Sequence, residues 1–118
     1  MYKRSERLKS LFLHEVNLFF QNKQEIKNGG LFTITGVELT DDSKLLKVYF
    51  SFFGDVDIEE KKRMLDSYIW DMKQIMKKRL KLKIIPNIIF AHDETPEKAN
   101  RIEEILKKID LEKRDENS

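Results

Sequence analysis

Cysteine is absent from this sequence, and glycine, proline and histidine are scarce. Without cysteine the chain can form neither a disulfide framework nor a thiolate metal site. Its four glycines, at positions 29, 30, 36 and 54, do not form a phosphate-binding loop of the Walker or dinucleotide type. The two histidines, His14 and His92, are far apart in the sequence, so a paired-histidine metal motif is missing. We therefore expect no bound metal and no cofactor.

Long apolar runs are also missing. No stretch approaches the roughly 18 apolar residues of a membrane span, and the N-terminus lacks an apolar signal region. Charged residues make up 37% and hydrophobic residues 40% of the 118 positions, a balance typical of a globular domain. We expect one cytoplasmic domain over residues 1–110, followed by a polar tail over residues 111–118. It should be monomeric and have no membrane partner.

Charge is present in unequal blocks, although the net charge is only +2. Residues 61–92 contain nine Lys or Arg against two Asp or Glu, whereas residues 28–60 contain two against seven. A basic block inside a nearly neutral chain creates a focused positive field. Such a block is either a solvated helix face or a surface that binds anions.

The stretch 57–90 is the centre of the basic block and predicts one long helix followed by a short strand. Asp57 is a suitable N-cap residue. Arg79 would turn back into the apolar face of an unbroken helix, so we expect a kink or an end near residues 77–79. The apolar positions recur at spacings of three and four, the period of a helix: Met64, Leu65, Tyr68, Ile69, Met72, Ile75, Met76 and Leu80.

The opposite face of this helix carries the single Trp of the chain among cations. On an unbroken helix, Arg63, Trp70, Lys73 and Lys77 lie within roughly 80° of one another. Phosphate neutralisation by Lys and Arg, combined with base stacking on an aromatic ring, is typical of RNA binding. Packing of Trp70 against the first or last helix is the alternative. The predicted RNA-binding residues are Arg4, Arg7, Arg63, Trp70, Lys73, Lys77, Lys78, Arg79, Lys81, Lys83 and Arg101.

The remaining pattern predicts a helix over residues 5–27, strands over 31–39 and 45–53, a third strand over 84–90, and a last helix from Thr95. A strand-helix-strand unit implies that the second and third strands are parallel, with the second in the centre. The predicted fold is α+β, a two-layer domain of order α-β-β-α-β-α with a three-stranded mixed sheet. This is the order of a type II KH domain without its G-x-x-G loop. Its expected core includes Leu11, Phe12, Val16, Val48, Phe50, Leu65, Ile69, Met72 and Ile88.

Five segments resemble the ribosome-binding factor A family, in its order and spacing. Residues 4–8 (RSERL) resemble its basic N-terminal opening, 32–39 (FTITGVEL) its first strand, and 47–53 (KVYFSFF) its second strand. Residues 79–90 (RLKLKIIPNIIF) are similar to its R-L-R-x-x-P-x-L-x-F signature, and 93–102 (DETPEKANRI) to its D-x-S-x-E-x-G-x-R-I segment. Members break the central helix at an A-x-G sequence, and Tyr68-Ile69-Trp70 stands there in this chain. Ala99 replaces the family's usual glycine.

The resemblance implies a KH-like fold and no catalytic activity. It also implies binding to the free, immature small ribosomal subunit and its ribosomal RNA, near the 5′-terminal helix and the decoding region. Such a factor assists late RNA processing and supports growth in the cold. Two alternatives remain open at this point. One is a protein-interaction module that uses a sheet edge or the acidic 28–60 surface, and the other is an enzyme that uses His92 and Asp93.

Overall fold

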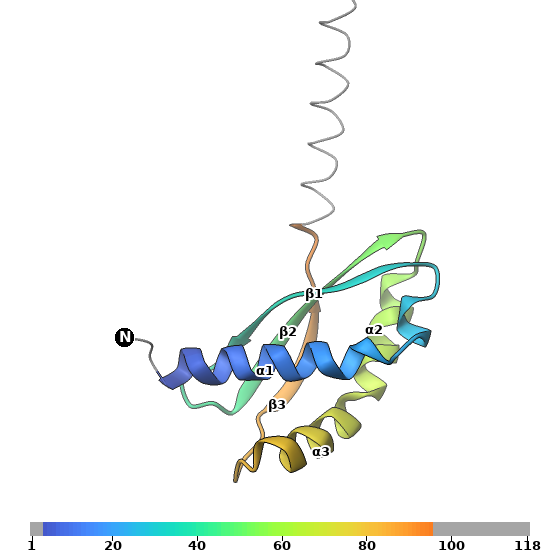
Figure 1. Ribbon diagram of the computed structural model, residues 1–118. Coiled ribbons are helices and arrows are strands. Elements are labelled where there is room, and N and C mark those ends of the chain that lie inside the picture. Colours follow the sequence, from blue (N-terminus) through green and yellow to red (C-terminus); the bar gives the residue numbers. More distant parts are fainter. Residues whose placement is uncertain (1–3, 96–118) are drawn as a thin grey trace, which may run out of the picture.

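A computed structural model describes residues 4–95 of the chain, and the predicted last helix and polar tail lie outside this range. The elements follow the order α1 (Arg4–Gln21), a 3-10 turn η1 (Glu25–Lys27), β1 (Gly30–Leu39) and β2 (Leu45–Gly54). They continue with α2 (Ile58–Ser67), α3 (Ile69–Leu80) and β3 (Asn87–His92). The helices cover one face of the sheet, with α1 crossing in front of the strands in Figure 1. This two-layer arrangement confirms the predicted type II KH-like fold.

The sheet has the order β1-β2-β3, with β2 in the centre as predicted. β1 and β2 are antiparallel, whereas β2 and β3 are parallel, with Leu45 opposite Asn87 and Phe50 opposite His92. A bulge between Ile34 and Gly36 leaves Thr35 without a partner in the β1–β2 register. Because the bulge adds one residue, Ile34 and Val37 both face the helices although they are three positions apart.

The core lies between the sheet and the helices. β2 supplies alternate side chains to it, since successive strand residues point to opposite faces. All of the expected core residues are buried except two: Ile69 is half-buried against the core, and Leu11 is 38% exposed, so its prediction was wrong. Leu11 lies about a third of a turn from the buried row of α1 at 100° per residue. The buried hydrophobic residues that α1 and β2 contribute are Phe12, Val16, Phe20, Leu46, Val48, Phe50 and Phe52.

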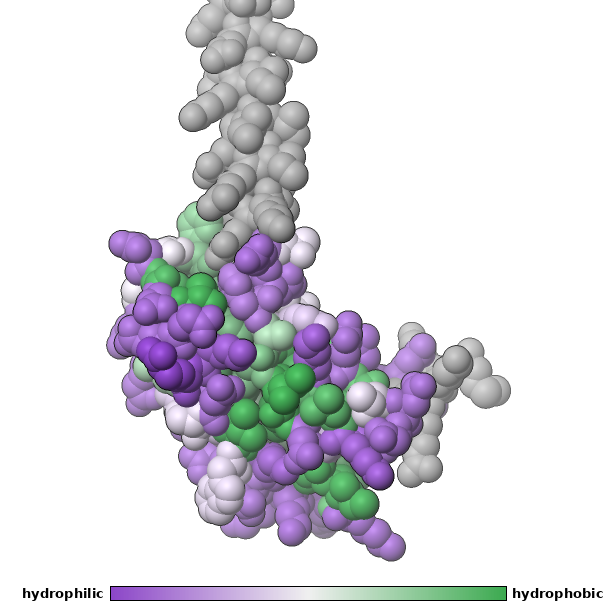
Figure 2. Space-filling model, turned by 180° about the vertical axis from the view of Figure 1, so that it is seen from behind, coloured by the Kyte–Doolittle hydropathy of each residue, from purple (hydrophilic) through white to green (hydrophobic). Residues whose placement is uncertain are grey.

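Among residues 4–95, no helix covers the opposite face of the sheet (Figure 1). Leu31 and Phe53 are paired across β1 and β2 and are 67% and 55% exposed, and Ile89 of β3 is exposed as well. Apolar residues gather in the middle of the face seen from behind (Figure 2). The protein therefore buries one face of its sheet and leaves apolar side chains on the other.

The predicted single helix after Asp57 is two helices. The second helix ends at Leu80, so the end expected near residues 77–79 is confirmed to within one residue, whereas the helical period did not predict the break at Tyr68. Asp57 caps α2 as predicted, because its Oδ1 accepts from the backbone N–H of Glu59 and Glu60 at 3.0 and 3.3 Å. α2 ends at Ser67, and α3 continues without a break to Leu80. The break at Tyr68 instead coincides with the position at which the family resemblance placed it.

Local hydrogen bonds explain the break. The Ser67 hydroxyl donates to the Met64 carbonyl at 2.6 Å, and the Tyr68 backbone N–H donates to the Leu65 carbonyl at 3.0 Å. Both contacts reach back three residues instead of four, which tightens the last turn of α2. The Tyr68 phenol then donates to the Glu25 carboxylate at 2.7 Å, and its ring lies edge-on to Phe19 and Phe20. Tyr68 is thereby held against η1 and α1 while α3 begins in a new direction.

The C-terminal end of the first helix and both ends of the third strand differ from prediction. The helix predicted over residues 5–27 ends at Gln21, and η1 follows as a separate turn with buried Ile26. The strand predicted over 84–90 spans 87–92. Pro86 has no N–H to donate to a ladder, and the strand begins directly after it.

Candidate nucleic-acid interface

The orientation of α3 is set by its apolar residues. Met72 and Met76 are buried in the core, so the residues half a turn away face solvent. Trp70 on that side is 70% exposed, which argues against the alternative that it packs against α1. It lines a hollow of about 490 Å³ together with Gln74, Ile75, Lys77 and Lys78. These five residues are called the α3 face below.

The α3 face combines three kinds of recognition chemistry. The exposed indole of Trp70 offers a flat surface for stacking, and the Gln74 amide offers both a hydrogen-bond donor and an acceptor. Lys77 and Lys78 supply two exposed ammonium groups on the same hollow. Ile75 belongs to the apolar stripe of the predicted helix but is 43% exposed, because Met72 and Met76 take the inward positions of this helix. The side chains can therefore bind an aromatic ring and an anion next to each other.

Two other predicted cations of α3 lie at its margins. Lys73 is half-buried and donates through Nζ to the Asn87 side-chain oxygen at 3.0 Å, at the start of β3. Arg79 donates through Nε to Glu15 of α1 at 2.7 Å. This contact raises the pKa of the Arg79 guanidinium, through the hydrogen bond first and the Coulomb attraction second. Both residues thus connect α3 to its neighbours, and their positive charges remain near the α3 face.

Arg63 does not lie on the same helix as Trp70, so one helical wheel cannot describe both residues. It is exposed on α2, and the break at Tyr68 gives α2 and α3 separate axes. The predicted 80° arc, which assumed one continuous helix, was therefore wrong for Arg63. Arg7 is exposed on α1, Arg4 is the first residue of α1, and Arg101 lies outside the described residues.

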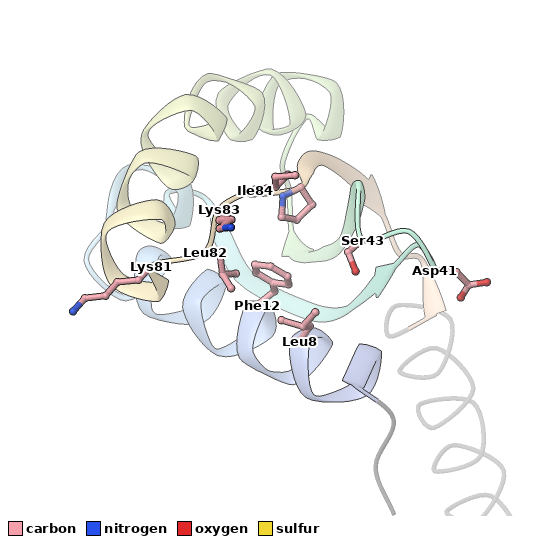
Figure 3. Close-up of a pocket in the computed structure, with 9 residues that line it drawn as sticks. Leu8, Phe12, Asp41, Ser43, Lys81, Leu82, Lys83 and Ile84 are labelled. Atoms are coloured by element: carbon pink, nitrogen blue, oxygen red, sulfur yellow. The ribbon is translucent and has the colours of Figure 1, made fainter.

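Lys81 and Lys83 belong to the linker between α3 and β3. This linker borders a larger pocket of about 620 Å³ whose apolar walls include Leu8 and Phe12 of α1. Figure 3 shows Lys81 extending away from the pocket, while Phe12 and Leu8 point into it. Lys81 adopts a left-handed conformation with φ of 53°, which ends α3 and turns the chain toward β3. The linker cations consequently lie apart from the hollow at Trp70.

The residues of the enzyme alternative have structural contacts. The Asp93 carboxylate accepts from the Thr35 hydroxyl at 2.8 Å and from the Thr95 backbone N–H at 3.0 Å. The hydrogen bonds from Thr95, followed by the one from Thr35, lower the pKa of Asp93. The His92 ring lies 5.5 Å from the ring of Phe50. Among residues 4–95, no cluster of three or more His, Asp or Glu side chains is arranged to hold a metal ion.

A membrane-spanning helix is likewise not found in the part of the chain that the structure describes, since none of its helices is long and apolar enough.

Two residues of the α3 face, Gln74 and Ile75, were not among the predicted RNA-binding residues. For Gln74 a sequence signal existed, because residues four apart share a helix face and Gln74 follows Trp70 by four positions. The exposure of Ile75 had no such signal, because an isoleucine in a helical apolar stripe indicates burial.

Comparison with known proteins identifies one family. A family model described as ribosome-binding factor A matches residues 4–106. A ribosome-binding factor A from Thermodesulfovibrio yellowstonii is 35% identical over 108 residues, which cover 92% of each chain. One from Geobacter sulfurreducens is 32% identical over 114 residues, covering 96% of this chain and 97% of the relative.

A solved structure shows the same fold. The crystal structure of ribosome-binding factor A from Thermus thermophilus superimposes with a TM-score of 0.64 at 19% identity. The superposition covers 75% of this chain and 93% of that chain.

Proposed function

The chain belongs to the ribosome-binding factor A family, and we propose on this premise that it binds the small ribosomal subunit during assembly. The α3 face makes the main contact with ribosomal RNA. The observation that carries this proposal is the exposure of Trp70 beside Lys77 and Lys78 on one hollow. Lys73 and Arg79 add positive charge at the margins of this face. The candidates on neighbouring segments are Arg63, Lys81 and Lys83, and the secondary candidates are Arg4, Arg7 and Arg101.

Docking depends on shape and charge more than on base sequence. A type II KH domain usually clamps the RNA backbone with a G-x-x-G loop, and the break at Tyr68-Ile69-Trp70 contains no glycine. The lysines of the α3 face would instead neutralise phosphates and release their counterions. The partner is the free, immature subunit, because its late-folding RNA still exposes surfaces that the mature subunit buries.

The protein acts by binding and not by catalysis, as a cytoplasmic monomer. Binding assists late ribosomal RNA processing. Growth in the cold depends on the factor most, because misfolded RNA refolds slowly at low temperature. The use of Asp93 in contacts to Thr35 and Thr95 supports a structural role for this acid.

Co-sedimentation with immature small subunits, mature small subunits and large subunits tests the proposal. We expect preferential binding to the immature small subunit, with an affinity that falls steeply as salt rises. The double variant Lys77→Gln with Lys78→Gln should bind at least about tenfold more weakly and reduce the salt slope by about 2. The matched control, Lys27→Gln with Lys44→Gln, removes two exposed charges elsewhere and should bind as wild type. Equal, salt-insensitive binding to both subunits would overturn the proposal.

A second candidate function is protein interaction through the open face of the sheet, which the exposure of Leu31 and Phe53 favours. In that case Phe53→Ser should weaken subunit binding at all salt concentrations alike, while the lysine variants would have no effect.

A further inference from the structure

Two hollows adjoin on the outer side of α3. The hollow at Trp70 and a second one of about 370 Å³ are both lined by Ile75, so they meet at this residue. The second hollow runs from α3 to α1 and is also lined by Lys23 and Arg79. Lys23 lies over the rings of Phe19 and Tyr68, at 5.0 and 5.5 Å from their centres. A track with cations along its length therefore extends from Trp70 across α3 to α1.

The exposed ring in this track favours unpaired RNA over an RNA duplex. In an A-form duplex the bases are stacked inside the helix, and proteins contact mainly phosphates and 2′-hydroxyls. A duplex could use Lys77 and Lys78 but would leave the indole of Trp70 without a partner. An unpaired nucleotide can place its base on an exposed aromatic ring, which stabilises the complex whatever the base.

The spacing along α3 suits one nucleotide with its neighbouring phosphates. Lys77 is seven residues beyond Trp70, about 10 Å along the helix axis. Gln74 lies between them on the same face, where its amide can contact a base edge. Negative phosphates on either side of the base would then meet Lys77 and Lys78 in one direction and Lys23 in the other.

We propose that the α3 face holds an unpaired RNA nucleotide, with its base stacked on Trp70 and its phosphates at Lys77 and Lys78. This inference rests on the proposed function, and it adds that the RNA contacted here is single-stranded. Part of the preference for immature subunits would then arise from RNA that has not yet paired.

Trp70 is the only tryptophan of the chain, so its fluorescence reports the site directly. The full-length protein is titrated with a short single-stranded RNA and with a hairpin of the same phosphate count. We expect the single strand to quench Trp70 fluorescence and the hairpin to bind without quenching. Lys77→Gln with Lys78→Gln should require more RNA to reach the same final quenching.

Trp70→Leu, followed by the anisotropy of labelled RNA, should lose roughly five- to hundredfold in affinity for the single strand and little for the hairpin. Trp70→Phe should recover part of this loss, and thermal melting checks that both variants are folded. The proposal is overturned if both RNAs quench equally, if neither quenches, or if a polyglutamate peptide quenches as strongly as RNA.

The subunit assay separates this inference from the proposed function. Subunit binding that persists without quenching by single-stranded RNA rejects only the nucleotide site. Quenching without any subunit binding rejects the proposed function and leaves the nucleotide site standing.

Discussion

Arg79 of α3 and Glu15 of α1 form an ion pair across 2.7 Å in which the two partners differ sharply in exposure. The Glu15 side chain is only 5% exposed, whereas that of Arg79 is 53% exposed. A carboxylate in such a position needs a partner, because removing it from water without one is costly. Arg79 therefore covers Glu15 and joins the two helices that flank the track described above.

Replacing Arg79 should accordingly affect stability before it affects RNA binding. Arg79→Gln should lower the Tm measurably, because the Glu15 carboxylate loses its charged partner. Lys78→Gln, one position earlier and exposed, should leave the Tm unchanged. The double variant Arg79→Gln with Glu15→Gln should lose less than the two single variants together. Strictly additive losses would show that the pair does not couple.

The Tyr68 phenol gives the protein a stability change at alkaline pH. Burial, together with the hydrogen bond to Glu25, raises its pKa from an ordinary 10.0 to about 12. The folded state thus holds the phenol proton more tightly than the unfolded state, and the protonated phenol stabilises the fold. This contribution to the free energy of unfolding is fully present below about pH 10 and is lost as pH rises through about 12.

Urea unfolding across this pH range checks the prediction. Tyr68→Phe should be less stable than wild type at neutral pH, and the difference should shrink above pH 10. Tyrosinate absorbance should show one of the three tyrosines titrating late. A difference between wild type and Tyr68→Phe that is the same at neutral and strongly alkaline pH would contradict the assignment.

Two glycines of the β1–β2 hairpin should differ in how much stability they lose when replaced by alanine. Gly54 has a φ of +137°, and a Cβ there would lie 2.7 Å from the Gly29 carbonyl oxygen. Gly36 has no neighbouring atom within 4 Å of such a Cβ. We expect Gly54→Ala to cost about 1–3 kcal/mol of unfolding free energy and Gly36→Ala to stay within about 0.5 kcal/mol. Equal thermal melting curves for the two variants would refute the strain assigned to Gly54.

Asp93 should make the protein sensitive to acid. Its pKa is lowered by the hydrogen bonds from Thr95 and Thr35, so its contribution to stability is present above the ordinary carboxyl pKa of 3.8. The contribution is lost as pH falls through the lower, folded-state value. Asp93→Ala should be less stable than wild type at neutral pH and should approach it in strong acid. Thr35→Val should show a smaller effect in the same direction, and a gap that does not narrow with pH would exclude this explanation.

The fold was largely predictable from the sequence because its pattern is consistent. Alternation in β2 identified the buried side of the sheet, and the helix between β2 and β3 implied a parallel pair. Leu11 was misplaced because a helical stripe does not reveal its own centre, and here the row through Phe12 and Val16 contacts the sheet. The break at Tyr68 combines local hydrogen bonds that reach back three residues with contacts to Glu25, Phe19 and Phe20, which are distant in sequence. The helical period did not indicate it, and only the family resemblance placed it there.

The candidate site was only partly predictable. Charge and helical period placed Trp70 and Lys77 on the outer face, which is where the structure has them. Lys78 was predicted to bind RNA but was not placed on that face, and it lines the same hollow. The contacts of Lys73 with Asn87 and of Arg79 with Glu15 could not be read from spacing on one helix, because each partner belongs to another element. Whether these residues bind RNA stays a prediction.

The parallel pairing of β2 with β3 also determines the order in which the domain can assemble. The β1–β2 hairpin closes through a short turn in which the Asp42 carboxylate accepts from Thr40 and Lys44, whereas β3 must wait until α2 and α3 have spanned the sheet. We expect Asp42→Ala to slow refolding and Ile88→Val, at a cost of about 0.5–1.5 kcal/mol, mainly to speed unfolding. Stopped-flow chevron plots measure both rates. If β3 belonged to the folding nucleus, Ile88→Val would slow refolding instead of speeding unfolding. The strand that completes the sheet is then the last to join and the first to leave.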